Sequence, residues 1–332
     1  MSAATVTAAA SNTQFLQDPK VRRARRRRAD PLVERRFPLH LEPHMQTIRG
    51  LYHQAKTAHW DPEKHIPWAK FDASAYGAEQ LRAAALSWSR RAWTEYGGLP
   101  ETPAILIRFC LEHGGESDPK MFLTVRGSEE AWHTECCWRF ADLVGKYSDR
   151  PASDHYAGLF NQDFHREAFE PGISVDAYIA VHSAILDGID LELNRGYLRH
   201  ATDPVALSML KRMVQDKERH VAFGWVYLAE RAAGWDDAAR AEISAEIDQA
   251  LEGLLLSGAI CAWLAPGGIA DDIVAADAIT RQAGLGAMSV AEESAVVAQF
   301  LGEARDHLAR LGVAMADIRD RAAAGDRVVV AG

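Results

Sequence analysis

The stretch SEEAWH at residues 128–133 and the stretch DKERHVAFG at residues 216–224 decide the fold of this 332-residue sequence. In the first, Glu130 and His133 are three residues apart, a spacing that places both side chains on one face of an α-helix. In the second, the apolar residues after His220 turn that histidine toward the protein interior. A single pair of this kind is weak evidence for a site, because charged residues at helical spacing usually face solvent.

The pattern occurs twice, and each copy has an acidic residue on the helix before it. Glu101 lies 32 residues before His133, and Asp187 lies 33 residues before His220. Four helices that direct carboxylates and imidazoles inward can assemble a dinuclear metal site in the core of a bundle. Such ligands suit iron and manganese. The sequence therefore predicts an all-α four-helix bundle with a metal site between its core helices.

Caps and helix breakers predict where the helices of this bundle begin and end. We expect helices over residues 75–96, 101–112, 118–147, 175–200 and 204–231, with Ser174 and Asp203 capping the last two. Residues 51–68 read as an extended lead-in anchored by aromatic side chains. The apolar run 254–265 predicts a core helix that is too short to cross a bilayer. Only residues 328–330 resemble a strand.

The composition and the positions of helix-breaking residues suggest three regions. Residues 1–50 are expected to form a basic, largely disordered tail and lead-in with an arginine run at 22–28, residues 51–235 the metal-binding bundle, and residues 236–332 further helices packed on it. The net charge of -9 argues against a nucleic-acid partner. Four cysteines without C-x-x-C spacing, and a start without a secretory pattern, predict a cytoplasmic protein with no membrane association.

These motifs resemble the ferritin-like superfamily, in particular its non-haem diiron-carboxylate oxidases and oxygenases and the small subunit of class I ribonucleotide reductase. The resemblance covers about residues 60–231 and implies a ferritin-like four-helix bundle with additional helices. It implies iron as the cofactor, with manganese, a mixed Mn/Fe pair or a single ion as alternatives, and O2 as the co-substrate. Carried over position by position, it implies metal ligands at Glu101, Glu130, His133, Asp187 and His220, with Asp216 orienting the imidazole of His133.

The second motif departs from the family pattern at Lys217, where a glutamate is expected. Asp216 and Glu218 point roughly 100° away on either side and do not replace it. Three carboxylates and one ammonium give a charge of about -2, which one divalent ion neutralises, and a second ion would lie beside a cation in a low dielectric. The sequence therefore predicts one ion or none. Glu95 is a rival of Glu101, and Asp190 and Glu192 are rivals of Asp187.

Three roles for Lys217 remain open at this point. It could pair with Glu101 or Asp187 and replace the ion, which would make the chain resemble the metal-free variants among the reductase subunits. It could lose its proton through burial and act as a nucleophile, amine donor or base. It could also extend to the surface.

The predicted function is a metal-dependent oxidase or oxygenase that uses O2 on a small organic substrate, held in an apolar pocket beside the metal. Glu130 and Lys217 are its expected catalytic residues. We expect an electron-donating reductase as partner and a homodimer as the assembly. The alternative is an altered protein of the same fold, either a metal-free or single-metal enzyme that depends on Lys217 or a non-catalytic helical scaffold.

Overall fold

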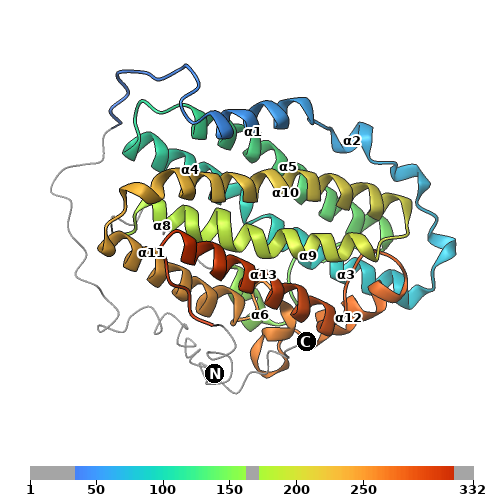
Figure 1. The fold of residues 1–332 in the computed structure, drawn as a ribbon. Coiled ribbons are helices and arrows are strands. Elements are labelled where there is room, and N and C mark those ends of the chain that lie inside the picture. The colour runs from blue at the N-terminus through green and yellow to red at the C-terminus, as the bar shows by residue number, and fades with distance from the viewer. Residues whose placement is uncertain (1–33, 162–171, 318–332) are drawn as a thin grey trace, which may run out of the picture.

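The computed structural model describes residues 34–161 and 172–317, which fold into a bundle of α-helices (Figure 1). The predicted all-α class is therefore confirmed. Within the described ranges, backbone pairing outside helices is limited to two isolated β-bridges, and no helix there has the length and apolarity needed to cross a bilayer. Most of the tail predicted to be disordered, including its arginine run at 22–28, lies outside the described residues, and so does the strand candidate at 328–330.

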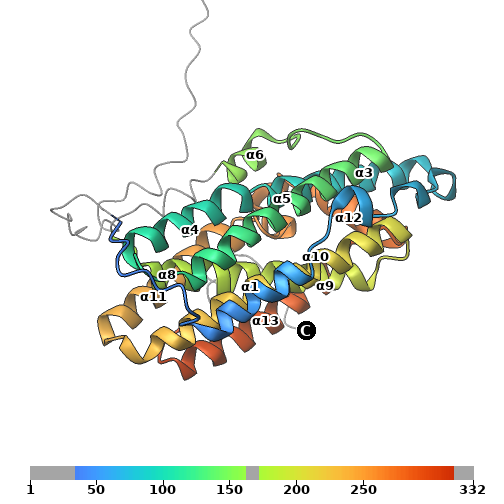
Figure 2. The same ribbon diagram turned by 90° about the horizontal axis from the view of Figure 1, so that it is seen from above.

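The bundle consists of the helices α3 (Ala78–Glu95), α4 (Gly98–Glu112), α5 (Asp118–Val144), α9 (Asp187–Arg199) and α10 (Pro204–Arg231). Helix α10 runs along the long axis of the molecule between α5 and α9 (Figures 1 and 2). Helices α3 and α4 both pack on α5, and α9 packs on α10, so each half of the sequence repeat forms one side of the bundle. Asp203 caps α10 because its Oδ1 accepts the backbone N–H groups of Val205 and Ala206.

The helix predicted over 175–200 contains a π-helical segment. It begins as α8 (Val175–Ile179), capped by Ser174 as predicted, widens into η4 (Ala180–Leu186) and continues as α9. Helix α10 lies directly against this segment at Gly224, where an added Cβ would lie only 2.5 Å from the carbonyl carbon of Ser183. π-Helical turns are rare and often occur near functional sites, and here the segment ends immediately before Asp187.

The sequence predicted a largely disordered tail up to residue 50 and an extended lead-in from residue 51, but the structure has helix α1 (Gln46–Thr57) there. Its buried residues Ile48, Leu51 and Ala55 recur at helical spacing and pack the helix against α5 and α10. The chain then runs through three short turns, α2 (Pro62–His65), η2 (Trp68–Lys70) and η3 (Ala73–Ala75). Trp60, just before α2, is buried, so the aromatic anchoring predicted for residues 51–68 is present.

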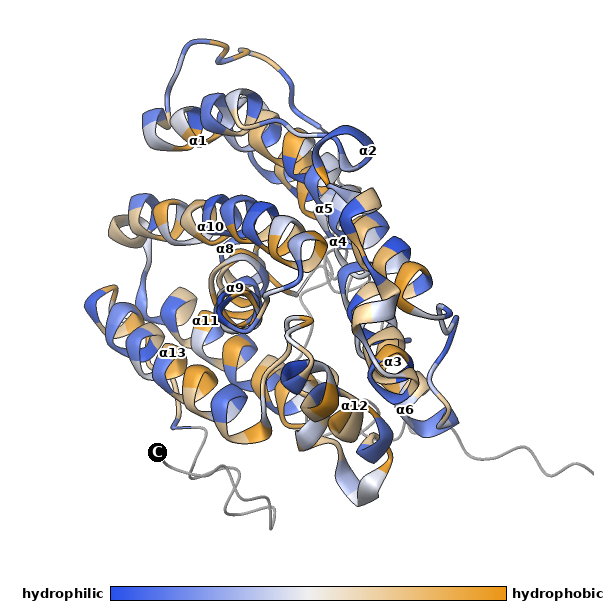
Figure 3. Cartoon of the chain, turned by 90° about the vertical axis from the view of Figure 1, so that its right-hand side faces the viewer, coloured by the Kyte–Doolittle hydropathy of each residue, from blue (hydrophilic) through white to orange (hydrophobic). Residues whose placement is uncertain are grey.

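The C-terminal helices share the core of the bundle. Helix α12 (Asp271–Gln282) packs on α3 and α13 (Val290–Arg310) packs on α9, so that α9 lies between α10 and α13 (Figure 3). Helix α11 (Asp237–Ala250) packs against α8 and η4. The main hydrophobic core extends from Ile48 to Met315 and includes residues of α11 and α13. Ile273 of α12 belongs to a smaller cluster with Tyr156, Ala262 and Ala270.

Residues 254–265 are buried as expected, but they do not form the predicted helix. The short π-helix η6 (Leu251–Leu255) ends in turns that lead to the 3-10 helix η7 (Ala262–Leu264). Gly258 has a φ of 89°, a left-handed conformation, and an added Cβ would lie 2.4 Å from the backbone of Ala265. The glycine therefore folds the run back on itself.

Glu293 on α13 predicts a pH-dependent stability. This carboxyl is 4% exposed and accepts a hydrogen bond of 3.0 Å from the hydroxyl of Tyr197. Burial, with help from nearby Asp277, raises its pKa from 4.5 to about 7 against the opposing effect of Arg90 and Arg91. Because the folded state holds this proton more tightly than the unfolded state, the stability that it contributes is complete below pH 4.5 and is lost as the pH rises through 7.

Glu293→Gln should remove this pH dependence, which amounts to at most about 3 kcal/mol. The measurement is the free energy of unfolding by urea at pH 5 and pH 8. Glu303→Gln, an exposed site on the same helix, is the matched control and should follow the wild type. Parallel pH profiles for Glu293→Gln and the wild type would contradict the expectation.

Candidate metal centre

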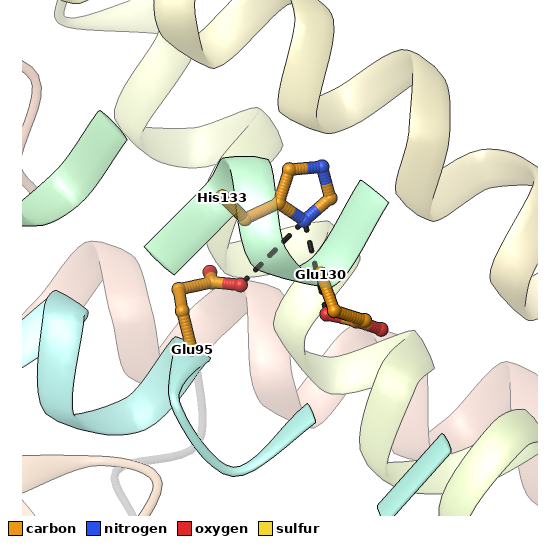
Figure 4. Close-up of side chains that lie close together, drawn as sticks. All are labelled: Glu95, Glu130 and His133. Carbon is orange, nitrogen blue, oxygen red and sulfur yellow. Dashed lines mark ion pairs between the residues drawn. The ribbon is translucent and has the colours of Figure 1, made fainter. Parts of the chain in front are cut away.

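Glu95, Glu130 and His133 converge in the interior of the bundle (Figure 4). Glu95 is the last residue of α3, whereas the other two come from α5. The Nδ1 atom of His133 lies 3.7 Å from Oε2 of Glu95 and 3.9 Å from Oε2 of Glu130. One ligand atom from each residue lies within 4.8 Å of the others, and all three side chains are buried. This spacing suits one metal ion.

The ring of His133 is held in an orientation that suits metal binding. Its Nε2 lies 3.0 Å from Oδ2 of Asp216, the contact that the family resemblance implied, and the same oxygen accepts a 2.7 Å hydrogen bond from the indole of Trp60. With the proton on Nε2, the lone pair of Nδ1 faces the two glutamates, and Nδ1 has no hydrogen-bond partner among the described residues. A buried lone pair beside two carboxylates fits a cation between them.

His220 has the mirrored arrangement on α10. Its Nε2 lies 2.8 Å from Oε2 of Glu129, and its Nδ1 lies 3.3 Å from Oε1 of Glu130. Burial lowers the pKa of His220, but the two glutamates outweigh it and raise the pKa to about 9. Glu130 thus lies between the two histidines, with one oxygen toward each.

Arg219 joins the two carboxylates that orient these histidines. Its Nη2 donates to Oε1 of Glu129 at 2.6 Å and also to Asp216. Sequence reasoning found Asp216 but missed Glu129 and Arg219. The available signal was that Glu129 stands immediately before Glu130, as Asp216 stands immediately before Lys217.

Lys217 is buried at 4% exposure, so it does not extend to the surface. Its Nζ donates to Oε2 of Glu95 at 2.9 Å and to Asp190. The sequence suggested Glu101 or Asp187 as the partner of Lys217, but the structure pairs it with the alternative acids Glu95 and Asp190. Burial lowers the pKa of Lys217, but Asp190 and Glu95 outweigh it and hold the pKa well above its ordinary value. The side chain is therefore an ammonium ion, and the neutral nucleophile or base considered from the sequence does not fit.

Glu101 and Asp187, two of the predicted ligands, gather around Arg126 instead. The guanidinium of Arg126 lies 3.0 Å from Oδ2 of Asp187, 3.1 Å from Oε1 of Glu130 and 3.8 Å from Oε1 of Glu101. Burial raises the pKa of Asp187 to about 6 in spite of Arg126. Sequence reasoning did not single out Arg126, which lies one helical turn before Glu130.

The helices place these acids in two layers. Glu95 and Glu101 lie on either side of the turn between α3 and α4, and Asp187 and Asp190 lie one turn apart on α9. Glu95 and Asp190 contact Lys217 and form one layer. Glu101 and Asp187 contact Arg126 and form the other, and Glu130 lies between the two layers. Five carboxylates outnumber Lys217, Arg126 and a protonated His220, and the net negative charge that remains favours a bound metal ion.

Gly98 makes room for the carboxylate of Glu130. An added Cβ at this first residue of α4 would lie 2.6 Å from Oε2 of Glu130. The close approach of the backbone fixes where that carboxylate lies, on the side that faces His133.

Two solved structures of R2-like ligand-binding oxidases have the same fold as this chain. One, with an aerobically reconstituted metal cofactor after photoconversion, has a TM-score of 0.61 at 17% identity and covers 78% of this chain and 92% of its own. Another, with an aerobically reconstituted Mn/Fe cofactor, has a TM-score of 0.63 at 16% identity and covers 80% and 94%. The ferritin-like resemblance is thereby confirmed for the fold. No protein-family model matches the chain, and no curated protein matches it in sequence.

Proposed function

We propose that the protein is a metal-dependent oxidase that binds one ion between Glu95, Glu130 and His133. The observation that carries the proposal is the buried Nδ1 of His133, which faces two carboxylates while Asp216 fixes the other ring nitrogen. Two carboxylates and one imidazole suit iron or manganese. Three protein ligands leave coordination positions open for O2 and a small organic substrate. The R2-like oxidases of the same fold, one of them with a Mn/Fe cofactor, support this choice of metals.

The ion would supply the electron-transfer chemistry with O2, and the chain would position and shield it. Asp216 holds the proton on Nε2 of His133, which keeps Nδ1 available as a ligand. Lys217 donates a hydrogen bond to Oε2 of Glu95 and acts as a fixed positive charge beside the site, in place of the base considered from the sequence. Phe122 and Phe223, stacked 5.0 Å apart next to His220, help to exclude water. The apolar substrate pocket, reductase partner and homodimer remain predictions.

The contact between Lys217 and Glu95 favours a second candidate. In that alternative the ammonium ion stays paired with Glu95 and Asp190 in place of a metal ion, and the protein is a metal-free enzyme or a helical scaffold. The two candidates differ in whether Glu95 and His133 take up an ion at all.

Metal analysis distinguishes them. The protein is purified anaerobically, saturated with Fe2+ or Mn2+ and freed of unbound metal, and the ions per chain are counted. O2 consumption by the ferrous form is then recorded. We expect one ion per chain, lost in Glu95→Gln and kept in Glu79→Gln, an exposed control on the same helix. A folded wild-type protein that binds no ion would favour the metal-free alternative.

A further inference from the structure

We propose that the guanidinium group of Arg126 takes the place of a second metal ion in this bundle. The inference rests on the proposed function, because it concerns the half of the site that the first ion does not fill. The family resemblance implies four metal ligands in addition to His133, namely Glu101, Glu130, Asp187 and His220. The three carboxylates of that set contact Arg126, and His220 contacts the glutamate oxygen that Arg126 binds.

The contacts of Arg126 resemble the coordination of a cation. Its Nε donates to Glu130, its Nη2 to Asp187 at 3.2 Å and its Nη1 to the hydroxyl of Ser183 at 3.1 Å, while Glu101 lies 3.8 Å away. The three carboxylates come from three helices, α4, α5 and α9. Arg126 is 1% exposed, so its charge is neutralised by these carboxylates and not by solvent. A planar guanidinium with several donors can satisfy carboxylates from several directions.

A second divalent ion and this guanidinium compete for the same oxygen atoms. Oε1 of Glu130 is 3.1 Å from Nε of Arg126 and 3.3 Å from Nδ1 of His220, so an ion held by this oxygen and this nitrogen would lie against a fixed positive charge. In a buried site such repulsion is screened very little by solvent. Arg126 therefore excludes the ion.

Lys217 has a different part in this arrangement. Its ammonium group bonds to Glu95 and Asp190, the other two carboxylates of the site. The charge argument from the sequence attributed the exclusion of a second ion to Lys217 alone. Lys217 also lies against an oxygen of the first half, Oε2 of Glu95, but it contacts only one of the two carboxylates there. Arg126 contacts all three carboxylates of the second half, so the geometry attributes the exclusion to Arg126.

Counting Mn2+ ions in matched variants tests the inference. The full chain is saturated with Mn2+ and freed of unbound metal, and bound ions are counted by metal analysis and by electron paramagnetic resonance, which detects coupling between neighbouring ions. Arg126→Leu and Arg126→Gln should each bind one more ion than the wild type. Arg126→Lys, which keeps the charge, and Lys217→Glu should bind the same number as the wild type. Added Mn2+ should also raise the Tm of the two neutral variants more than that of the wild type.

The difference from the wild type tests Arg126, whereas the number bound by the wild type itself tests the proposed function. A wild type without metal whose Arg126→Gln variant gains one ion would contradict the proposed function and support the inference. Folded neutral variants that gain no ion would overturn the inference, and so would Lys217→Glu if it alone gained one. Should Arg126→Leu fold only with Mn2+, that dependence would support it, and Arg126→Gln would still give the ion count.

Discussion

His133→Ala is expected to weaken the binding of Mn2+ or Fe2+ by at least about 100-fold, and His220→Ala by no more than about 10-fold. The two histidines stand at matching positions of the repeated motif, but only His133 directs a free Nδ1 toward both Glu95 and Glu130. The Nδ1 of His220 faces Oε1 of Glu130, on the side where Arg126 already supplies a positive charge. His220 thus affects the ion only through Glu130.

Calorimetric titration of the metal-free protein, or competition with a chelator of known affinity, measures both constants. Circular dichroism of each variant establishes that the helices are retained. Equal losses for the two variants would place the ion between the histidines and contradict a site confined to Glu95, Glu130 and His133. Such a result would also weaken the role proposed for Arg126.

Gly224→Ala is expected to destabilise the fold by about 2 to 3 kcal/mol. Glycine to alanine inside a helix is ordinarily stabilising by up to about 1 kcal/mol, so the expected sign is reversed here. The reason is that the new Cβ would lie 2.5 Å from the carbonyl carbon and 2.6 Å from the carbonyl oxygen of Ser183. These are backbone atoms of the π-helical segment, which cannot rotate away as a side chain can.

Gly302→Ala on α13 is the matched control, because an added Cβ there meets nothing within 4 Å. It should be neutral or stabilising. Urea unfolding followed by circular dichroism measures the free energy of unfolding of both variants. If Gly224→Ala were as stable as the wild type, α10 would not be packed against the π-helical segment as closely as described.

The fold follows from patterns that are local in the sequence. Ser174 and Asp203 act as the helix caps that their positions predict, and the long helices end within a few residues of the predicted bounds. The contact between Asp216 and His133 is the one that the family resemblance implied. A helical period of 3.6 residues and the chemistry of capping are properties of short segments, and a single sequence contains them.

The same periodicity could not select among neighbouring acids. Asp187 and Asp190 are three residues apart and share one face of α9, so both satisfy the pattern. Glu95 and Glu101 lie on either side of a turn whose path is not fixed by spacing alone. The axial position of each helix relative to its neighbours decides which acid meets which cation.

The buried arginines were the least accessible to sequence reasoning. Arginine is rarely fully buried, so nothing local distinguishes Arg126 and Arg219 from surface residues. Their burial is tolerable only because carboxylates from other helices, such as Asp187 for Arg126 and Glu129 for Arg219, reach them in the assembled bundle. The sequence by itself determined the main helices of the bundle and the two histidine motifs. Only the tertiary structure decided how the charges pair between helices, because that pairing depends on distances between segments far apart in the chain.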